Sequence, residues 1–140
     1  ESALDHLLTG AVLLDHALDW AEDLDAGRYN AFVACASGWP QTVEHQAANR
    51  QAVAAELLVG RAGQTYFQLL HRELTAARAL ARQAGCEDLA RYISWLRREA
   101  LSYRKAMAAT ARDQLHRAIE RGIAQKCRGT VRAVTEAMRR

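Results

Sequence analysis

The chain has 140 residues, of which 50% are hydrophobic and 25% are charged, and its formal net charge is +3. This composition excludes an intrinsically disordered polymer, which holds fewer apolar residues, and no apolar run reaches the ~18 residues that a membrane-spanning helix needs. One proline and eight glycines leave little material for turns, so long helices are expected.

The first part of the chain predicts two helices. Residues 2–25 form a long one, with Ser2 as its N-cap and Gly27 just past its end. Its apolar residues lie on several sides, which is typical of a helix that packs against more than one neighbour. The Gly-Trp-Pro segment at 38–40 is the clearest break, and a second helix is expected over about residues 42–60.

The rest of the chain predicts further helices over residues 64–84, 87–109, 110–124 and 128–139. Gly85 ends the first of these, and breaks are expected near Gly122 and Gly129. The apolar residues expected to point inward are Tyr66, Phe67, Leu69, Leu70, Leu74, Ala77, Leu80, Leu89, Tyr92, Ile93, Leu96, Leu101 and Tyr103. No strand alternation or internal repeat occurs, so an all-α antiparallel helical bundle is predicted.

The length suits one domain over residues 1–140, either a whole domain or the C-terminal half of a larger fold. Acidic side chains concentrate in residues 1–60 and basic ones in residues 61–140. The basic, amphipathic end at 110–140 suits a polyanion or an anionic membrane surface. No recognition-helix signature supports nucleic-acid binding, and scattered arginines on a solvated helix are the commoner case.

Several classes of catalytic site find no support in the sequence. Cys35, Cys86 and Cys127 are odd in number and widely spaced, so they match neither a zinc motif nor a disulfide scaffold. Three free thiols are typical of a reducing cytoplasm. No nucleophile elbow, phosphate-binding loop or dinucleotide fingerprint occurs, and the histidines lack the spacing of a helical di-iron site.

Four carboxylates lie on one side of the helix predicted over residues 2–25. They are Asp15, Asp19, Glu22 and Asp23, at spacings i, i+4, i+7 and i+8. Like charges at i and i+4 repel by roughly a few tenths of a kcal/mol, and a divalent cation would remove that penalty. Mg²⁺ prefers oxygen ligands and is usually held by one or two carboxylates together with phosphate oxygens. The row therefore suits a Mg²⁺–phosphate site.

The neighbours of these carboxylates indicate an amphipathic ligand. Arg28 follows the row, and arginine suits bidentate binding of phosphate oxygens. On the same side, Leu4, Leu8 and Val12 or Ala11 form an apolar wall that leads to the carboxylates. This arrangement fits a hydrophobic substrate with a charged head. An ordinary solvated helix face would show a similar polar pattern, so the residues alone leave both interpretations open.

Residues 13–28 resemble the second aspartate-rich motif of the class I (all-α) isoprenoid synthase superfamily. From Asp19 to Arg28 the sequence reads D-x-x-E-D-x-x-x-G-R, as in squalene and phytoene synthases. Asp15, Asp19 and the later Asp23 also follow the plan of trans-prenyltransferases. His16 stands where the prenyltransferases have a second aspartate, and Arg28 where they have a lysine.

The resemblance implies a helical fold around a central apolar cavity. In that fold Asp15, Asp19 and Asp23 bind Mg²⁺, with Glu22 as an auxiliary ligand, and Arg28 meets the diphosphate. The family pairs two acidic motifs on facing helices, and only one occurs here. The resemblance therefore implies that an upstream segment or a second subunit supplies the other motif, unless the protein is a non-catalytic relative.

The predicted function is Mg²⁺-assisted loss of diphosphate from an allylic prenyl diphosphate, as in a prenyltransferase or terpene synthase. The catalytic residues would be Asp15, Asp19 and Arg28. The alternative is a non-enzymatic helical module that self-associates, for example as a homodimer, or binds a polyanion through residues 110–140. The two hypotheses differ in whether Mg²⁺ with diphosphate stabilises the protein.

Overall fold

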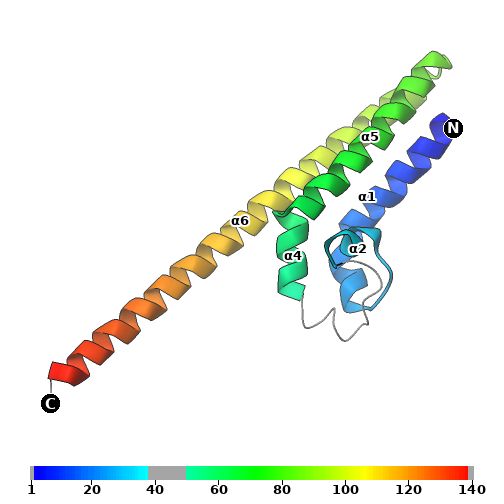
Figure 1. Cartoon of the computed structure of the whole chain (residues 1–140). Helices are drawn as coiled ribbons and strands as arrows, with labels where there is room; N and C mark the ends of the chain where they lie inside the picture. The colour runs from blue at the N-terminus through cyan, green and yellow to red at the C-terminus, as the bar shows by residue number, and fades with distance from the viewer. Residues whose placement is uncertain (1, 38–49, 139–140) are drawn as a thin grey trace. The chain divides into compact units, whose positions relative to one another are not determined.

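The computed structural model describes residues 2–37 and 50–138, and every regular element in these ranges is an α-helix, which confirms the all-α class. The helices are α1 (Ala3–Asp25), α2 (Ala31–Ser37), α4 (Arg50–Leu58), α5 (Arg61–Gln83) and α6 (Glu87–Met138) (Figure 1). The chain divides into two compact units, Glu1–Ala108 and Ala109–Arg140. The predicted break at 38–40 and the first part of the helix predicted over 42–60 lie outside the described residues.

Helix α1 begins where the sequence predicts because Ser2 and Asp5 cap each other. The Ser2 backbone N–H donates to Asp5 Oδ2 at 2.7 Å, and the Asp5 backbone N–H donates to Ser2 Oγ at 3.3 Å. This capping box satisfies two backbone N–H groups at the start of the helix. The helix ends at Asp25, and Gly27 turns the chain with a φ of 65°, which favours glycine. Both predicted ends are confirmed.

A tight turn joins α4 to α5. Gly60 is the N-cap of α5 and has no side chain to cap it, so the Glu56 carboxylate accepts a hydrogen bond from the Ala62 backbone N–H at 2.9 Å. Gly63 approaches the end of α4 so closely that a Cβ atom there would lie 1.8 Å from the Leu57 carbonyl oxygen. Because of this turn, α5 begins at Arg61, earlier than the predicted start at residue 64.

The last helix is longer than predicted. Helix α6 runs from Glu87 to Met138 without interruption at Gly122 or Gly129, so the predicted breaks are wrong. A glycine inside a helix costs only about 1 kcal/mol relative to alanine, which does not by itself end a helix. Gly85, by contrast, ends α5 as predicted, with a φ of 71°.

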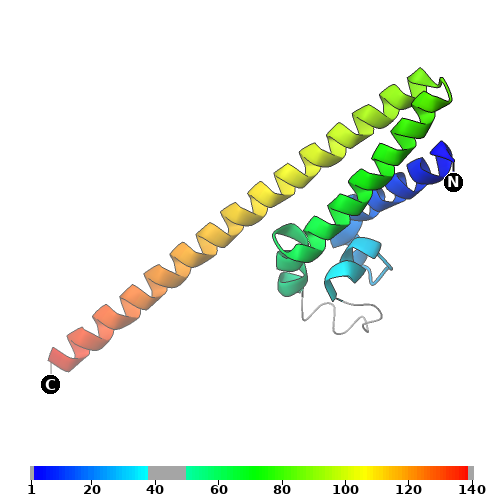
Figure 2. The ribbon, with the colours of Figure 1, turned by 45° about the horizontal axis from the view of Figure 1, so that its top comes forward.

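The core of the first unit lies where α1, α2, α4 and α5 meet the part of α6 before Ala108. Side chains with almost no exposure include Ala17, Phe32, Leu70, Leu74 and Ile93. Gly10 allows α1 and α5 to approach, since a Cβ atom there would lie 2.6 Å from Leu74 Cδ2. Figures 1 and 2 show α5 beside α1 and beside the first part of α6.

Polar contacts fix the rotation of α1 about its axis. The Tyr66 hydroxyl on α5 donates to the Leu13 carbonyl at 2.9 Å. Near the start of α1, His6 Nδ1 lies 2.7 Å from Glu73 Oε2, and both side chains are largely buried. These contacts lie on the side of α1 that faces α5, so they decide which residues α1 presents to solvent.

Two further features concern the described residues. Within residues 2–37 and 50–138, no helix combines the length and the apolar character needed to cross a membrane. Cys35 and Cys86 are free and lie exposed, and the side chain of Cys127 lies outside the described ones.

Candidate functional site

The outward face of α1 carries both the predicted apolar wall and two of the predicted metal ligands. Leu4, Leu8 and Val12 are 58%, 64% and 53% exposed. Asp15 and Asp19 are exposed as well, and they follow these aliphatic side chains along the same face of the helix. The opposite side of α1 is buried in the core through Gly10, Leu14, Ala17 and Leu24. We call Leu4, Leu8, Val12, Asp15 and Asp19 the α1 face.

Asp15 and Asp19 stand at i and i+4 with their carboxylates available. No hydrogen bond or ion pair within the described part of the chain engages either of them. Close to Asp19, the Tyr103 hydroxyl of α6 donates to the Ala17 carbonyl at 3.0 Å. Burial raises the pKa of Tyr103, and the negative charge of Asp19 raises it further. The phenol therefore stays protonated and continues to donate.

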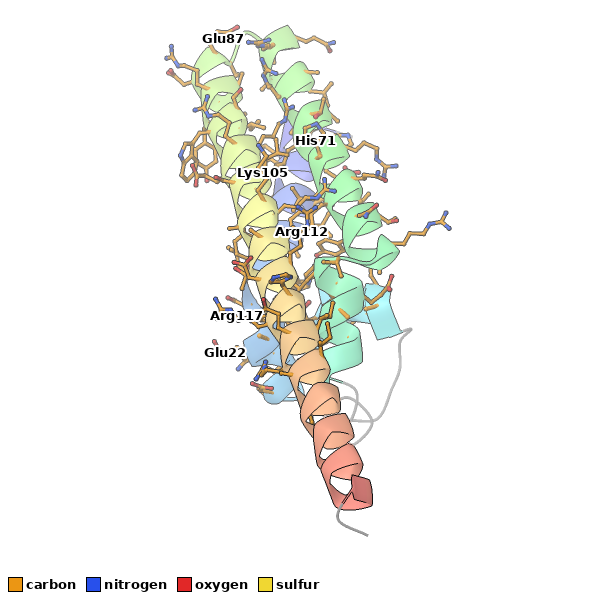
Figure 3. All side chains as sticks on the ribbon, turned by 90° about the vertical axis from the view of Figure 1, so that its left-hand side faces the viewer. Glu22, His71, Glu87, Lys105, Arg112 and Arg117 are labelled. Atoms are coloured by element: carbon orange, nitrogen blue, oxygen red, sulfur yellow. The ribbon has the colours of Figure 1, made fainter. Side chains whose placement is uncertain are left out.

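Glu22 and Asp23 are held in a different way, because both contact Arg28. The guanidinium Nε of Arg28 donates to Asp23 Oδ1 at 2.8 Å, and its Nη2 donates to Glu22 Oε1 at 2.9 Å. The Glu22 side chain is 76% exposed, whereas that of Asp23 is 13% exposed. Glu22 projects from the end of α1 (Figure 3), and so exposed a pair contributes little to stability.

Asn30 is the residue that sequence reasoning missed at this site. It is 1% exposed, and its Nδ2 donates to Asp23 Oδ2 and to the His16 carbonyl, each at 2.8 Å. Its Oδ1 accepts from the backbone N–H groups of Phe32 at 2.9 Å and Val33 at 3.2 Å. Asn30 is thus an N-cap of α2 that also fastens α2 to the end of α1.

These contacts explain the electrostatics of Asp23. Hydrogen bonds from Asn30, and then from Arg28, hold the pKa of the Asp23 carboxyl below its ordinary value of 3.8. Asp23, followed by Glu22, raises the pKa of Arg28 in turn. His16 has a structural role beside them, because its Nδ1 accepts from the Ala31 backbone N–H at 3.2 Å. An aspartate at position 16 could accept the same hydrogen bond. This contact therefore does not explain why the chain has a histidine where the prenyltransferases have an aspartate.

The four predicted ligands therefore separate into two pairs. Asp15 and Asp19 are outward and available, whereas Glu22 and Asp23 are paired with Arg28. Among the described residues, no group of three or more histidine, cysteine or acidic side chains lies close enough to hold a metal ion. Mg²⁺ is often coordinated by only one or two protein carboxylates, with phosphate oxygens and water as its other ligands. Asp15 and Asp19, at i and i+4, could supply those two carboxylates.

The available carboxylates and the aliphatic side chains beside them thus define the candidate site. Two of the five guanidinium N–H donors of Arg28 serve Glu22 and Asp23, which leaves others for an anion. Comparison of the chain with protein-family models, with curated proteins and with solved structures gave no significant match.

Proposed function

We propose that the α1 face is one wall of a Mg²⁺-dependent site for prenyl diphosphates, in a protein that resembles class I isoprenoid synthases. The observation that supports this most is the order of side chains on one exposed helix face. Leu4, Leu8 and Val12 are more than half exposed, and Asp15 and Asp19 continue the same face. A prenyl diphosphate has the same order, with a hydrocarbon chain that ends in an anionic head.

Burial of the exposed aliphatic side chains on the α1 face by a ligand or by another helix would be favourable. Burying a side chain of the size of leucine or valine is worth ~1.5–3 kcal/mol, and three such residues stand side by side on α1. Scattered surface leucines need no explanation, but a contiguous apolar row next to available carboxylates indicates a binding surface. We propose that the hydrocarbon chain of the substrate covers part of the row, and that a facing helical layer from an upstream segment or a second subunit covers the rest.

Each residue has a defined role in this proposal. Asp15 and Asp19 hold Mg²⁺, which, when bound, stabilises the charge of the departing diphosphate. Arg28 contributes N–H donors to the diphosphate oxygens from its place beside Asp23. Asp23 and Asn30 position Arg28 and the end of α1. Leu8 and Val12 exclude water from the hydrocarbon chain, so that the allylic cation left by diphosphate loss meets a carbon nucleophile.

Substitution of the available aspartates tests the proposal. In the protein at its natural length, Asp19→Asn is expected to lower Mg²⁺-dependent release of diphosphate from an allylic prenyl diphosphate by about 100-fold or more. Asp113→Asn, which changes another exposed helical aspartate, is the matched control and should leave the rate unchanged. Equal rates in the two variants would reject the site.

A non-enzymatic module that self-associates through the α1 face is the second candidate, and the exposure of Leu4, Leu8 and Val12 also favours it. Its signature is different. Leu8→Glu would then turn an oligomer into a monomer, as measured by light scattering, and Mg²⁺ with a prenyl diphosphate would leave the melting temperature unchanged. Under the enzyme proposal the same ligands raise the melting temperature, and Asp15→Asn removes that rise.

A further inference from the structure

A groove lies between α5 and the first part of α6, inside the first unit, and none of the residues that line it belongs to the α1 face. Its volume is about 280 Å³, close to the lower end of the range for small-molecule sites. The residues that line it are Phe67, Gln68, Leu70 and His71 of α5 and Arg97, Ala100, Leu101 and Arg104 of α6. Figure 3 shows the two helices side by side, with His71 labelled on α5.

The polar side of the groove carries positive charge that no acidic residue in its lining balances. Arg97 and Arg104 supply two guanidinium groups. Arg97 Nη2 lies 3.3 Å from His71 Nε2, and burial, followed by the charge of Arg97, lowers the pKa of His71. The imidazole is therefore neutral at pH 7 and accepts a hydrogen bond from Arg97. This contact places a guanidinium at the groove without neutralising it.

Arg97 also has a donor that the protein leaves unused. Its Nε is buried and has no hydrogen-bond partner among the described residues. Buried N–H groups in folded proteins nearly always have an acceptor, and a guanidinium binds planar oxyanions through two parallel N–H groups. The Arg78 Nε is buried and unpartnered in the same way, and because the Arg97 Nε is closed to solvent, an oxyanion in the groove reaches it only after the Arg97 side chain rotates.

The other side of the groove is hydrocarbon. Three of the apolar lining residues, Phe67, Leu70 and Ala100, are buried. A fourth, Leu101, is 41% exposed. A small inorganic anion would leave this apolar surface uncovered. A ligand that carries both an anionic head and a short hydrocarbon chain would satisfy the arginines and cover these apolar residues.

We propose that the α5–α6 groove binds an amphipathic oxyanion, a carboxylate or phosphate head on a short alkyl chain, with the head on Arg97 and Arg104 and the chain on Phe67, Leu70 and Leu101. The proposal does not depend on the α1 face, because the two sites share no residue.

Calorimetric titration of the full chain with octyl phosphate, below its micelle concentration, tests whether Arg97 and Arg104 bind the anionic head group of the ligand. The double variant Arg97→Gln Arg104→Gln is expected to bind at least about 10-fold more weakly than the unchanged chain, because it loses charge-assisted hydrogen bonds. Arg98→Gln, which changes an exposed arginine next to Arg97 that does not line the groove, should bind as the unchanged chain does. Equal affinity in all three proteins, or no saturable binding, would overturn the proposal.

Further titrations test the chain of the ligand and separate the two head chemistries. Leu101→Ser removes an apolar lining residue and is expected to weaken octyl phosphate binding while leaving the melting temperature within a few degrees. Octanoate in place of octyl phosphate distinguishes a carboxylate from a phosphate ligand. Inorganic phosphate should bind far more weakly than octyl phosphate, and octyl glucoside, which is neutral, should not bind. Equal binding of octyl phosphate and inorganic phosphate would contradict the amphipathic ligand.

Discussion

At the scale of single residues, Asn30 connects the fold to the candidate site. It caps α2, accepts two backbone hydrogen bonds there, and donates to Asp23 and to the His16 carbonyl. Asp23 in turn accepts from Arg28. A single buried amide therefore sets the position of the cation that the proposed function places at the diphosphate.

Replacement of Asn30 tests this role. Asn30→Ala removes an N-cap and leaves buried polar groups without partners, and each loss costs about 1–3 kcal/mol. We expect the free energy of unfolding, measured with urea, to fall by about 2–4 kcal/mol. Asn30→Ser keeps a capping oxygen and should lose less. An Asn30→Ala protein as stable as the unchanged chain would contradict the structure at this turn.

Asp23 gives the fold a dependence on pH. Because hydrogen bonds from Asn30 and Arg28 lower the folded-state pKa of Asp23 below 3.8, the contribution of this carboxylate to stability is fully present above the unfolded-state value. It is lost as the pH falls through the folded-state pKa. Between pH 6 and pH 3, the unchanged chain should therefore lose more stability than Asp23→Asn, as measured by urea unfolding at each pH. Parallel losses would show that Asp23 is not held in this way.

At the scale of elements, local chemistry fixes where the helices begin and end. The Ser2 N-cap and the helix ends at Gly27 and Gly85 lie where the sequence predicts them, and the structure adds the capping box with Asp5 and the positive φ angles of both glycines. The breaks expected at Gly122 and Gly129 do not occur, since a glycine ends a helix only where the next turn needs its backbone freedom. The number of glycines alone does not distinguish these cases.

Two glycines in helices should respond oppositely to alanine. At Gly63 a Cβ atom would lie 1.8 Å from the Leu57 carbonyl oxygen, so Gly63→Ala must displace the α4–α5 turn and is expected to destabilise the first unit by at least about 1–3 kcal/mol. At Gly122 nothing lies within 4 Å of the new atom, so Gly122→Ala should increase helicity, since alanine is favoured by about 1 kcal/mol in a helix. Thermal unfolding followed by circular dichroism measures both. A Gly63→Ala protein that melts as the unchanged chain does would contradict the close approach.

The inward faces show how far periodicity alone reaches. Tyr66, Phe67, Leu70 and Leu74 are buried as predicted, but Leu69, predicted to point inward, is 37% exposed. Tyr92 and Leu101 of α6 were also expected inward and are exposed. Neighbouring residues differ by about 100° around a helix, so an apolar run cannot all face one partner. Which of its members are buried depends on the helix that packs against them.

At the scale of the whole molecule, the sequence predicts the helical class but not the pairing of helices. Nothing in the local pattern indicates that His6 would meet Glu73 or that Tyr103 would bind the Ala17 carbonyl, because these contacts join segments far apart in the chain. The α5–α6 groove was missed for the same reason. By contrast, the order of apolar and acidic residues on the α1 face could be read from spacing within one helix. The sequence also predicted that α1 packs on several sides, whereas Leu4, Leu8 and Val12 are exposed.

The exposed order of apolar and acidic residues on α1 leads to the central claim, that Asp15 and Asp19 hold a metal against the diphosphate of an isoprenoid. Mn²⁺ accepts the same oxygen ligands as Mg²⁺ and broadens the NMR signals of nearby methyl groups. With Mn²⁺ and a prenyl diphosphate together, we predict that the Val12 methyl signals broaden far more than those of Leu89, which lies near the start of α6 and well before the Tyr103 whose hydroxyl contacts the Ala17 carbonyl, and that the effect is lost in Asp15→Asn Asp19→Asn. Unbroadened signals, or equal broadening in the double variant, would contradict the claim.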